Sequence, residues 1–340
     1  MDEVFGPRGA VSQERLKELS EKSDLRGWLQ VVTHFGAIGL AGWALHQTMG
    51  TWWMIGPFFV LGVLLNYLYA GEHEFSHSTV FRSPWLNEWF GRLCGFITLH
   101  PRDMDQIQHF AHHRYTQRWR QDGELYRPTY TLKSYLIGLT GLWLVQRFPR
   151  MIIRTALGKV DAPYIRGKNQ DRVILEARVT LAIVGVIIAA SIALRSWDAV
   201  IYWIAPLGLT KWAHNIQNLI EHNGMPHEGG IFENTRSTRT NALMRWMCWN
   251  MQYHTAHHAY PSVPFYRLKQ LHHEAFTANG LKPATMTYLG FQIAMIRQLM
   301  KSPEADWPQD AVHVGVGLTR FAEAPAKAAD ADAAADTAAA

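Results

Sequence analysis

Three short clusters of histidine stand out in this sequence, because each can aim two or three imidazoles at a single point. The clusters are His73-Glu74-Phe75-Ser76-His77, His109-Phe110-Ala111-His112-His113 and His254-Thr255-Ala256-His257-His258. A thinner fourth piece is Asn218-Leu219-Ile220-Glu221-His222. Residues three and four positions apart share one face of a helix, and neutral imidazole is a ligand for iron, zinc, copper and nickel. One four-coordinate ion cannot use all nine of these histidines, so the spacing predicts two metal ions.

A single histidine is usually an ordinary core or surface residue, and it is the repeated pattern that favours a metal site. The ordinary interpretation applies to the isolated histidines His34, His46, His100, His214, His227 and His313. His272-His273 lies in a charged amphipathic stretch and is expected to be solvated. Polar residues near the clusters are expected either to hydrogen bond to the ligands or to serve as helix caps and surface residues. They are Glu74, Glu221, Asp103, Asp105 and Asn250.

The first cluster also matches HExxH, a zinc protease motif in which Glu74 would be the general base. A membrane zinc protease is therefore an alternative, but it would leave seven of the clustered histidines without a role. A metal transporter is a further alternative. A transporter should place polar ligands near the middle of its membrane spans, whereas these clusters lie at or beyond the ends of the apolar runs.

The composition indicates a membrane protein. Of 340 residues, 48% are hydrophobic, 18% are charged and 14 are tryptophan. The two cysteines, Cys94 and Cys248, form no CxxC pair, which argues against a disulfide framework and against a thiolate metal site. The amino terminus lacks a basic segment followed by an apolar core, so no cleaved signal peptide is expected. The net charge of +5 is better explained by membrane topology than by a nucleic acid partner.

Four apolar segments are long enough to cross a bilayer as helices. Residues 28–47 and 51–70 contain no Asp, Glu, Lys or Arg, and the short link between them predicts a helical hairpin. Residues 173–194 and 199–220 are the other two, and Lys211 in the last one must snorkel or face the protein interior. Many arginines and lysines lie between Arg102 and Arg172, whereas the links within the two pairs of spans carry almost no charge. The positive-inside rule therefore places this segment and both termini in the cytosol.

This topology brings every candidate ligand to one side of the membrane. We therefore expect an all-α, multi-pass membrane protein with about four transmembrane helices and a cytosolic helical cap that holds the metals. Residues 1–25 are expected to form a cytosolic segment, residues 26–300 the membrane domain, and residues 301–340 a disordered tail rich in alanine. Residues 85–100 are expected to be interfacial or re-entrant, and residues 132–147 and 286–301 to be amphipathic helices on the membrane surface.

With these motifs in place, the chain resembles the membrane fatty acid desaturase family of histidine-box di-iron enzymes. The resemblance spans residues 30–275 and is carried by the HxxxH box that begins at His73 and the HxxHH boxes that begin at His109 and His254. The NxxxH piece at Asn218 and His222 is similar to the family's additional ligand site, where the asparagine reaches the metal through water. The run Tyr260-Pro261-Ser262-Val263-Pro264 after the last box is also typical of the family.

The resemblance implies a non-haem di-iron enzyme that uses dioxygen to desaturate an acyl lipid chain. The implied iron ligands are His73, His77, His109, His112, His113, Asn218, His222, His254, His257 and His258. Hydroxylases, hydrocarbon oxygenases and carotenoid oxygenases carry the same boxes and are the alternatives.

Two features of the sequence differ from those of one branch of this family. The chain has no His-Pro-Gly-Gly haem motif, and its third box begins with His254 rather than with glutamine. Both features disfavour front-end desaturases with a fused cytochrome b5 domain. The expected partners are a membrane lipid or acyl-chain substrate and an external electron donor, either ferredoxin or rubredoxin with its reductase. The expected location is a bacterial inner membrane, with the active site in the cytosol.

Overall fold

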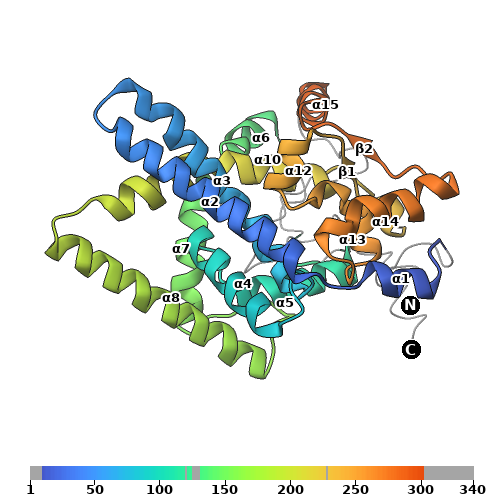
Figure 1. Cartoon of the computed structure of the whole chain (residues 1–340), viewed down its shortest axis with the longest axis horizontal. Coiled ribbons are helices and arrows are strands. Elements are labelled where there is room, and N and C mark those ends of the chain that lie inside the picture. Colours follow the sequence, from blue (N-terminus) through green and yellow to red (C-terminus); the bar gives the residue numbers. More distant parts are fainter. Residues whose placement is uncertain (1–9, 119–120, 125–130, 227–228, 302–340) are drawn as a thin grey trace.

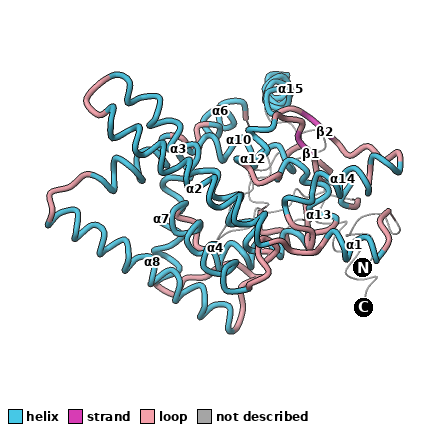
Figure 2. Tube along the Cα trace, viewed as in Figure 1, coloured by secondary structure: helices cyan, strands magenta, loops and turns pink. Residues whose placement is uncertain are grey.

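The computed structural model describes residues 10–118, 121–124, 131–226 and 229–301, and this part of the chain is predominantly helical (Figures 1 and 2). The first half contains α1 (Gln13–Leu19), α2 (Asp24–Thr48), η1 (Trp52–Met54), α3 (Ile55–Ser76), α4 (Pro84–Thr98), α5 (Arg102–Tyr115), α6 (Leu132–Leu139) and α7 (Leu142–Ala156). The central part contains α8 (Lys168–Ala193), η2 (Val200–Ile204), α9 (Ala205–Leu209) and α10 (Lys211–His222).

The remaining elements are short and build most of the cap. They are α11 (Ile231–Asn234), α12 (Ala242–Met247), η3 (Met251–Tyr253), α13 (His254–Ala259), η4 (Phe265–Arg267), α14 (Leu268–Ala275), η5 (Thr277–Asn279) and α15 (Tyr288–Lys301). The strands β1 (Ser237–Thr238) and β2 (Thr285–Met286) form one parallel pair. The expectation of a helical protein is therefore confirmed. The tail expected at residues 301–340 lies, apart from its first residue, outside the described residues.

Three of the described helices are long and apolar enough to cross a membrane: α2, the combined segment η1–α3, and α8. They cover the predicted spans 28–47, 51–70 and 173–194, except for Thr51 and Leu194 at the span ends. α2 and α3 form the predicted hairpin, and α8 is a separate arm in Figure 1. Trp52 and Trp53 are almost fully exposed at the tip of the hairpin, and Trp197 is exposed just after α8. Exposed indoles at the ends of apolar helices are typical of a membrane interface.

The fourth predicted span, residues 199–220, is not one continuous helix. It is divided into the π-helical turn η2, the short helix α9 and, after Thr210, the helix α10. Pro206 lacks the N–H group that an α-helix would direct at the preceding turn. The Asn66 amide of α3 donates to the Leu207 carbonyl at 2.9 Å and to the Thr210 hydroxyl at 2.9 Å, so side chains support the interrupted backbone. That this segment crosses the membrane stays a prediction.

The interrupted segment packs closely along α3. A Cβ atom on Gly62 would lie only 2.4 Å from the Pro206 carbonyl oxygen, so glycine is required for this approach of two backbones. Lys211 is buried at the start of α10, and its Nζ lies 4.9 Å from the centre of the Phe148 ring. Lys211 therefore faces the protein interior, which was one of its two expected positions.

The predicted surface helices are present with modified boundaries. The short apolar segment at residues 85–100 forms α4, which starts after the capping residue Ser83 and ends at Leu99 in the left-handed conformation. The helix expected at residues 132–147 is split into α6 and α7, because Gly141 adopts a φ of +68° between them. The helix expected at 286–301 begins two residues later as α15, because Met286 belongs to β2.

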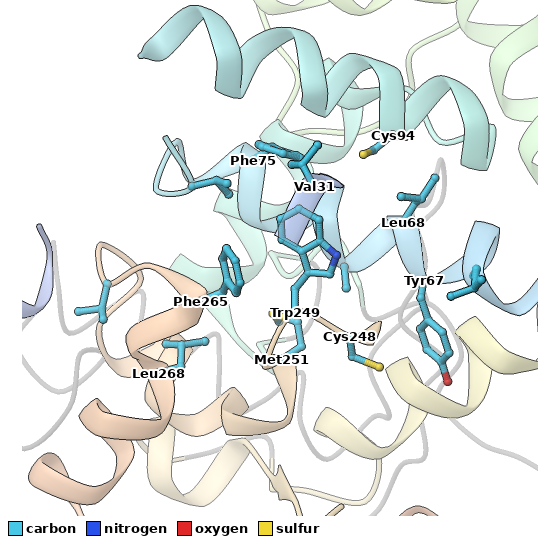
Figure 3. Close-up of a cluster of buried hydrophobic side chains, with 14 of the residues drawn as sticks. Val31, Tyr67, Leu68, Phe75, Cys94, Cys248, Trp249, Met251, Phe265 and Leu268 are labelled. Carbon is cyan, nitrogen blue, oxygen red and sulfur yellow. The ribbon is translucent and has the colours of Figure 1, made fainter. Parts of the chain in front are cut away.

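Trp249 joins the membrane hairpin to the segment that carries the third histidine cluster (Figure 3). The indole is completely buried, and its Nε1 donates to His34 Nδ1 of α2 at 3.1 Å. A Cβ atom on Gly71 of α3 would lie 2.9 Å from the indole. Phe75 and Phe265 also pack on the indole. This core fixes the position of α13 relative to the end of α3 that carries the first histidine cluster.

Candidate metal centre

The nine predicted histidines come together in two neighbouring groups. The first group contains His73, His77, His109, His113 and His257, and the second group contains His112, His222, His254 and His258. Within each group, the candidate ligand nitrogens all lie within 4.8 Å of one another. All nine side chains are buried except those of His77 and His222, which are half-buried. The groups therefore bring together residues from α3, α5, α10 and α13, which are far apart in the sequence.

Each HxxHH box contributes histidines to both groups. His109 and His113 are four residues apart on α5 and enter the first group, while His112 points into the second. On α13 the assignment is reversed, because His254 and His258 enter the second group and His257 the first. The boxes thus interlock, and the His113 and His258 rings stack with their centres 4.2 Å apart between the groups. Two adjacent metal ions, rather than two independent sites, fit this arrangement.

The imidazoles approach one another through their Nε2 atoms. In the first group, His73 Nε2 lies 2.8 Å from His257 Nε2, and His77 Nε2 lies 2.7 Å from His109 Nε2. In the second group, His222 Nε2 lies 2.7 Å from His254 Nε2 and 3.1 Å from His112 Nε2. Two nitrogens bound at right angles to one metal ion lie about 3.0 Å apart when each metal–nitrogen bond is about 2.1 Å. The residues therefore fit two metal ions, although ligation itself stays a prediction.

Acidic side chains lie behind four of these histidines, on the Nδ1 side that faces away from the group. The Asp122 carboxylate accepts a hydrogen bond from His112 Nδ1 at 2.9 Å. Glu74 lies 3.6 Å from His257 Nδ1, Glu221 lies 3.7 Å from His254 Nδ1, and Glu124 lies 3.8 Å from His109 Nδ1. Glu124 differs from the others, because its second carboxylate oxygen also lies 3.8 Å from His112 Nε2. A carboxylate behind a ligand histidine orients the ring and raises its basicity.

Sequence reasoning found two of these four carboxylates. Glu74 and Glu221 were candidates because they lie inside the first and fourth motifs, whereas Asp122 and Glu124 follow the second box at a distance that no helical spacing predicts. The backbone N–H groups of Gln117 and Glu124 donate to Asp122, each at 2.8 Å. These bonds belong to a tight turn after α5, which only the folded chain reveals.

The other three polar candidates lie elsewhere. Asp103 forms ion pairs with three arginines, the closest at 2.7 Å. Asp105 lies 3.2 Å from His100 Nδ1, and the Asn250 amide donates to the Phe265 carbonyl at 3.2 Å. Asn250 also has a φ of +59°, so its role is in the turn before α13. None of the three therefore contacts a histidine of either group among the described residues.

Asn218 lies on α10 one helical turn before His222, and its side chain is half-buried. This position is compatible with an approach to the second group through water, and that role stays a prediction. His222 is oriented by its own contact, because its Nδ1 lies 3.0 Å from the carbonyl oxygen of Asn234.

The protonation of the cap histidines follows from their burial. Burial, reinforced by neighbouring imidazoles, lowers the pKa of His109, His254 and His258 well below the ordinary value. Burial also acts to lower the pKa of His112, but the carboxylates of Asp122 and Glu124 outweigh it and raise this pKa to about 9. Three of these four rings are therefore neutral at physiological pH, which is the form that binds metal.

A third buried polar group lies beside the centre and was not expected from the sequence. It contains Glu72, His100 and Asp105, whose ligand-type atoms also lie within 4.8 Å of one another. His100 had been taken as an isolated core histidine, and its ring is 4.9 Å from that of Phe148. The sequence feature that indicates this third group is the position of Glu72 and Asp105, each within one helical turn of a histidine box.

An apolar cavity of about 330 Å³ lies next to this group. It is formed by α7, α8 and α9 together with the end of α4, and its lining includes Leu144, Phe148, Ile152, Leu181 and Trp203. Lys211 is the one charged residue in the lining. A second apolar pocket, between α8 and η2, shares Val184, Trp203 and Ile204 with the first. Both pockets lie beside α8, which is long enough to span a membrane.

Comparison with known proteins links this centre to lipid desaturation. A family model described as fatty acid desaturase matches residues 50–289, a segment that contains all nine histidines and Asn218. An sn-1 oleoyl-lipid 12-desaturase of Arthrospira platensis is 22% identical over 292 residues, which cover 77% of each chain. A protein of the same description from Picosynechococcus is 23% identical over 283 residues, or 75% of this chain and 78% of that protein. A fatty acid desaturase of Bacillus subtilis is 24% identical over 218 residues, or 59% and 62% of the two chains.

Proposed function

The chain belongs to the fatty acid desaturase family, and from that premise we propose that it is a di-iron, dioxygen-dependent desaturase acting on the acyl chains of membrane lipids. As a family member it is an oxidoreductase of lipid metabolism with membrane-helix character. The observation that carries the finer proposal is the pair of interlocked histidine groups. All-imidazole donor sets suit iron among other metals, and the family membership favours iron.

When bound, a pair of irons supplies the reduction of dioxygen and the removal of hydrogen from an unactivated C–H bond. The chain's own residues hold and orient this pair. His112 is aligned by Asp122 and His222 by the Asn234 carbonyl. The remaining Nε2 atoms are presented by helical turns of α3, α5 and α13. The buried surroundings exclude bulk water from the centre.

The zinc protease alternative is disfavoured by the position of Glu74. A general base must face the metal-bound water, next to the metal-facing atoms of the two histidines. Glu74 instead lies behind His257, on its Nδ1 side, while the Nε2 of His257 faces His73 and His113. Glu74 is therefore placed to orient a histidine.

The substrate is proposed to be an acyl chain esterified in a bilayer lipid. Two relatives are described as acting on an oleoyl lipid, and the apolar space between α7, α8 and α9 offers a matching environment for a hydrocarbon chain. Desaturation also needs two external electrons, which we assign to a ferredoxin or rubredoxin with its reductase. Hydroxylation by the same centre is the alternative outcome, because positioning of the chain decides between the two products.

The proposed topology has four crossings, with the metal centre and both termini in the cytosol of a bacterial cell. The exposed Trp52, Trp53 and Trp197 support an outer interface at the two links, and the exposed Lys168 supports an inner position for the start of α8. Single cysteines introduced at Met49 and Ser196 should react with a membrane-impermeant reagent added outside, and one at Lys168 should not. Labelling of Lys168→Cys from outside would invert the proposed orientation.

The decisive test is reconstitution of the iron-loaded protein in lipid vesicles with ferredoxin, its reductase and dioxygen, followed by mass spectrometry of the lipids. Loss of two hydrogens from an acyl chain supports desaturation, and gain of one oxygen supports hydroxylation. His112→Ala is the inactive variant, and His46→Ala is the matched control, because His46 lies on the surface bonded to Tyr202. An absence of either product with fully loaded protein on acyl, alkane and carotenoid substrates would refute hydrocarbon oxidation.

A further inference from the structure

Phe110 is an exception to the burial of α5. Most side chains from Met104 to His113 are buried, but Phe110 is 46% exposed. Its ring centre lies 5.6 Å from that of His77 and 6.4 Å from that of His109. A solvent-exposed aromatic ring therefore contacts the first histidine group directly. His77 is also the most exposed member of that group.

Phe110 lines a cleft of about 620 Å³ between α5 and the segment that connects α7 to α8. We define the Phe110 cleft by Phe110, Arg114, Tyr115, Tyr164 and Arg166. Arg114 lies one helical turn after Phe110, and both arginines are exposed. Among the described residues neither guanidinium forms an ion pair with a carboxylate, unlike that of Arg92 on the neighbouring helix.

Positive charge also surrounds the Phe110 cleft. Arg118 follows α5, Lys168 begins α8, and both side chains are exposed. Asp161, the nearest acidic residue before Arg166 in this segment, is already paired with Arg154 at 2.6 Å. The cleft is therefore a basic surface with aromatic side chains at its centre, which is the composition that recognises an acidic protein partner.

We propose that the Phe110 cleft is the docking surface for a small acidic one-electron carrier protein, and that Phe110 is the contact through which its electrons reach His77 and His109. This proposal rests on the proposed function, since a desaturase needs such a carrier. Dioxygen takes up four electrons as it becomes two waters. Two of them leave the acyl chain with two hydrogens, and the other two arrive singly from two carrier molecules, with two protons from solvent.

Electron delivery requires an encounter with the carrier and a short path from the docked carrier to the histidine rings, and the Phe110 cleft provides both. Exposed arginines speed the encounter with an acidic partner through long-range attraction, and the aromatic contact brings the docked carrier close to the metal-facing rings. The carrier approaches from the side that the proposed topology places in the cytosol. No described carboxylate competes for Arg114 or Arg166 at this surface.

The test uses iron-loaded full-length protein in lipid nanodiscs and a plant-type two-iron two-sulfur ferredoxin as the probe. Arg114→Glu and Arg166→Glu should each raise the KM for ferredoxin about tenfold at low ionic strength, and should flatten its dependence on salt. Lys269→Glu is the matched control, because Lys269 is exposed on α14, which packs on α13 and not on α5. It should leave the KM for ferredoxin unchanged. Equal effects of all three variants would overturn the assignment.

A second measurement separates electron delivery from catalysis. Protein reduced with dithionite, freed of excess reductant and mixed with dioxygen should give the same product yield per iron pair for wild type, Arg114→Glu and Arg166→Glu. Phe110→Ala should leave ferredoxin binding intact but slow the limiting rate of iron reduction by ferredoxin several-fold. An unchanged limiting rate would remove Phe110 from the electron path.

The outcomes also distinguish the two proposals. If wild-type protein gives no product after chemical reduction, the proposed function fails. In that case ferredoxin binding and iron reduction still test the proposal that the Phe110 cleft is the docking surface. If Arg114→Glu instead weakens use of the lipid substrate in the chemically reduced protein, the cleft binds an anionic lipid head group and the docking proposal is overturned.

Discussion

The two histidine groups are presented by the same boxes, yet they are held in place differently. In the second group, His112 and His222 each make a short outer contact, at 2.9 Å to Asp122 and 3.0 Å to the Asn234 carbonyl, whereas His254 Nδ1 has no hydrogen-bond partner among the described residues and lies 3.7 Å from Glu221. In the first group, the Nδ1 atoms of His109 and His257 have no hydrogen-bond partner within the described structure, and their carboxylates lie at 3.8 and 3.6 Å.

The difference reflects where the rings come from. Four members of the first group are supplied as i,i+4 pairs by the long helices α3 and α5, namely His73 with His77 and His109 with His113. Helix geometry alone aligns such pairs. The second group draws its members from the short helix α13, the end of α10 and a single position on α5. Two of its rings, those of His112 and His222, are oriented by contacts from outside the group.

The largest effect should come from removing one ligand of each group. His257→Ala disrupts the first group and His112→Ala the second, and each should abolish turnover while membrane insertion is retained, because the spans are separate from the centre. Iron analysis should show a fall from about two ions per chain toward about one. Near-normal activity of either variant would break the assignment of its group, and one tightly bound zinc without iron would revive the protease interpretation.

Asp122→Asn should have the next largest effect and should act on the second group. Loss of the charged partner at 2.9 Å from His112 should lower metal affinity about 10- to 100-fold. Titration with a chelator, followed by iron analysis, measures this. Asp122→Glu should restore part of the affinity, which a purely structural role in the turn would not permit. Equal release of both irons would contradict the separation of the two groups.

Glu124→Gln and Glu74→Gln should have smaller effects than Asp122→Asn. Their carboxylates lie 3.8 and 3.6 Å from His109 and His257, beyond hydrogen-bond distance, so neither forms the short contact that Asp122 makes with His112. We expect a loss of metal affinity of about tenfold or less, measured in the same chelator titration. A complete loss of activity with Glu74→Gln but full iron content would point to a general base and oppose our interpretation.

The smallest effect should come from Arg15→Ala, which lies outside both groups. Arg15 pairs with Glu274 at 2.8 Å, joins α1 to α14 and lowers the pKa of Glu274 from 4.5 to about 2. Because the folded pKa is the lower one, any stabilisation is present above pH 4.5 and is lost as the pH falls toward 2. The pair is only half-buried and is screened by solvent, so the variant should show little change in thermal unfolding at pH 7. Its iron content and turnover should match wild type, and a loss of iron would show that α1 supports the centre.

Much of the helical structure of this protein can be predicted from its sequence, because the patterns that indicate it are local. Apolar runs of membrane length predict the helices α2, α3 and α8, since apolar length indicates whether a helix fits a bilayer. The fourth segment was misread as one helix, because hydropathy does not register what Pro206 and Asn66 do to the backbone. Its interruption depends both on Pro206 within the segment and on Asn66 of the partner helix α3.

The spacing within each box, by itself, determined which histidines lie on one helical face, because that spacing follows from the geometry of a single helix. The tertiary structure decided which group each histidine enters. It places His112 and His257 in the group opposite to that of the other histidines in their boxes. It alone also placed Asp122 behind His112 and set the exposed Phe110 against His77. These contacts depend on how α3, α5, α10 and α13 are packed, and packing is a property of the whole folded chain that no short motif encodes.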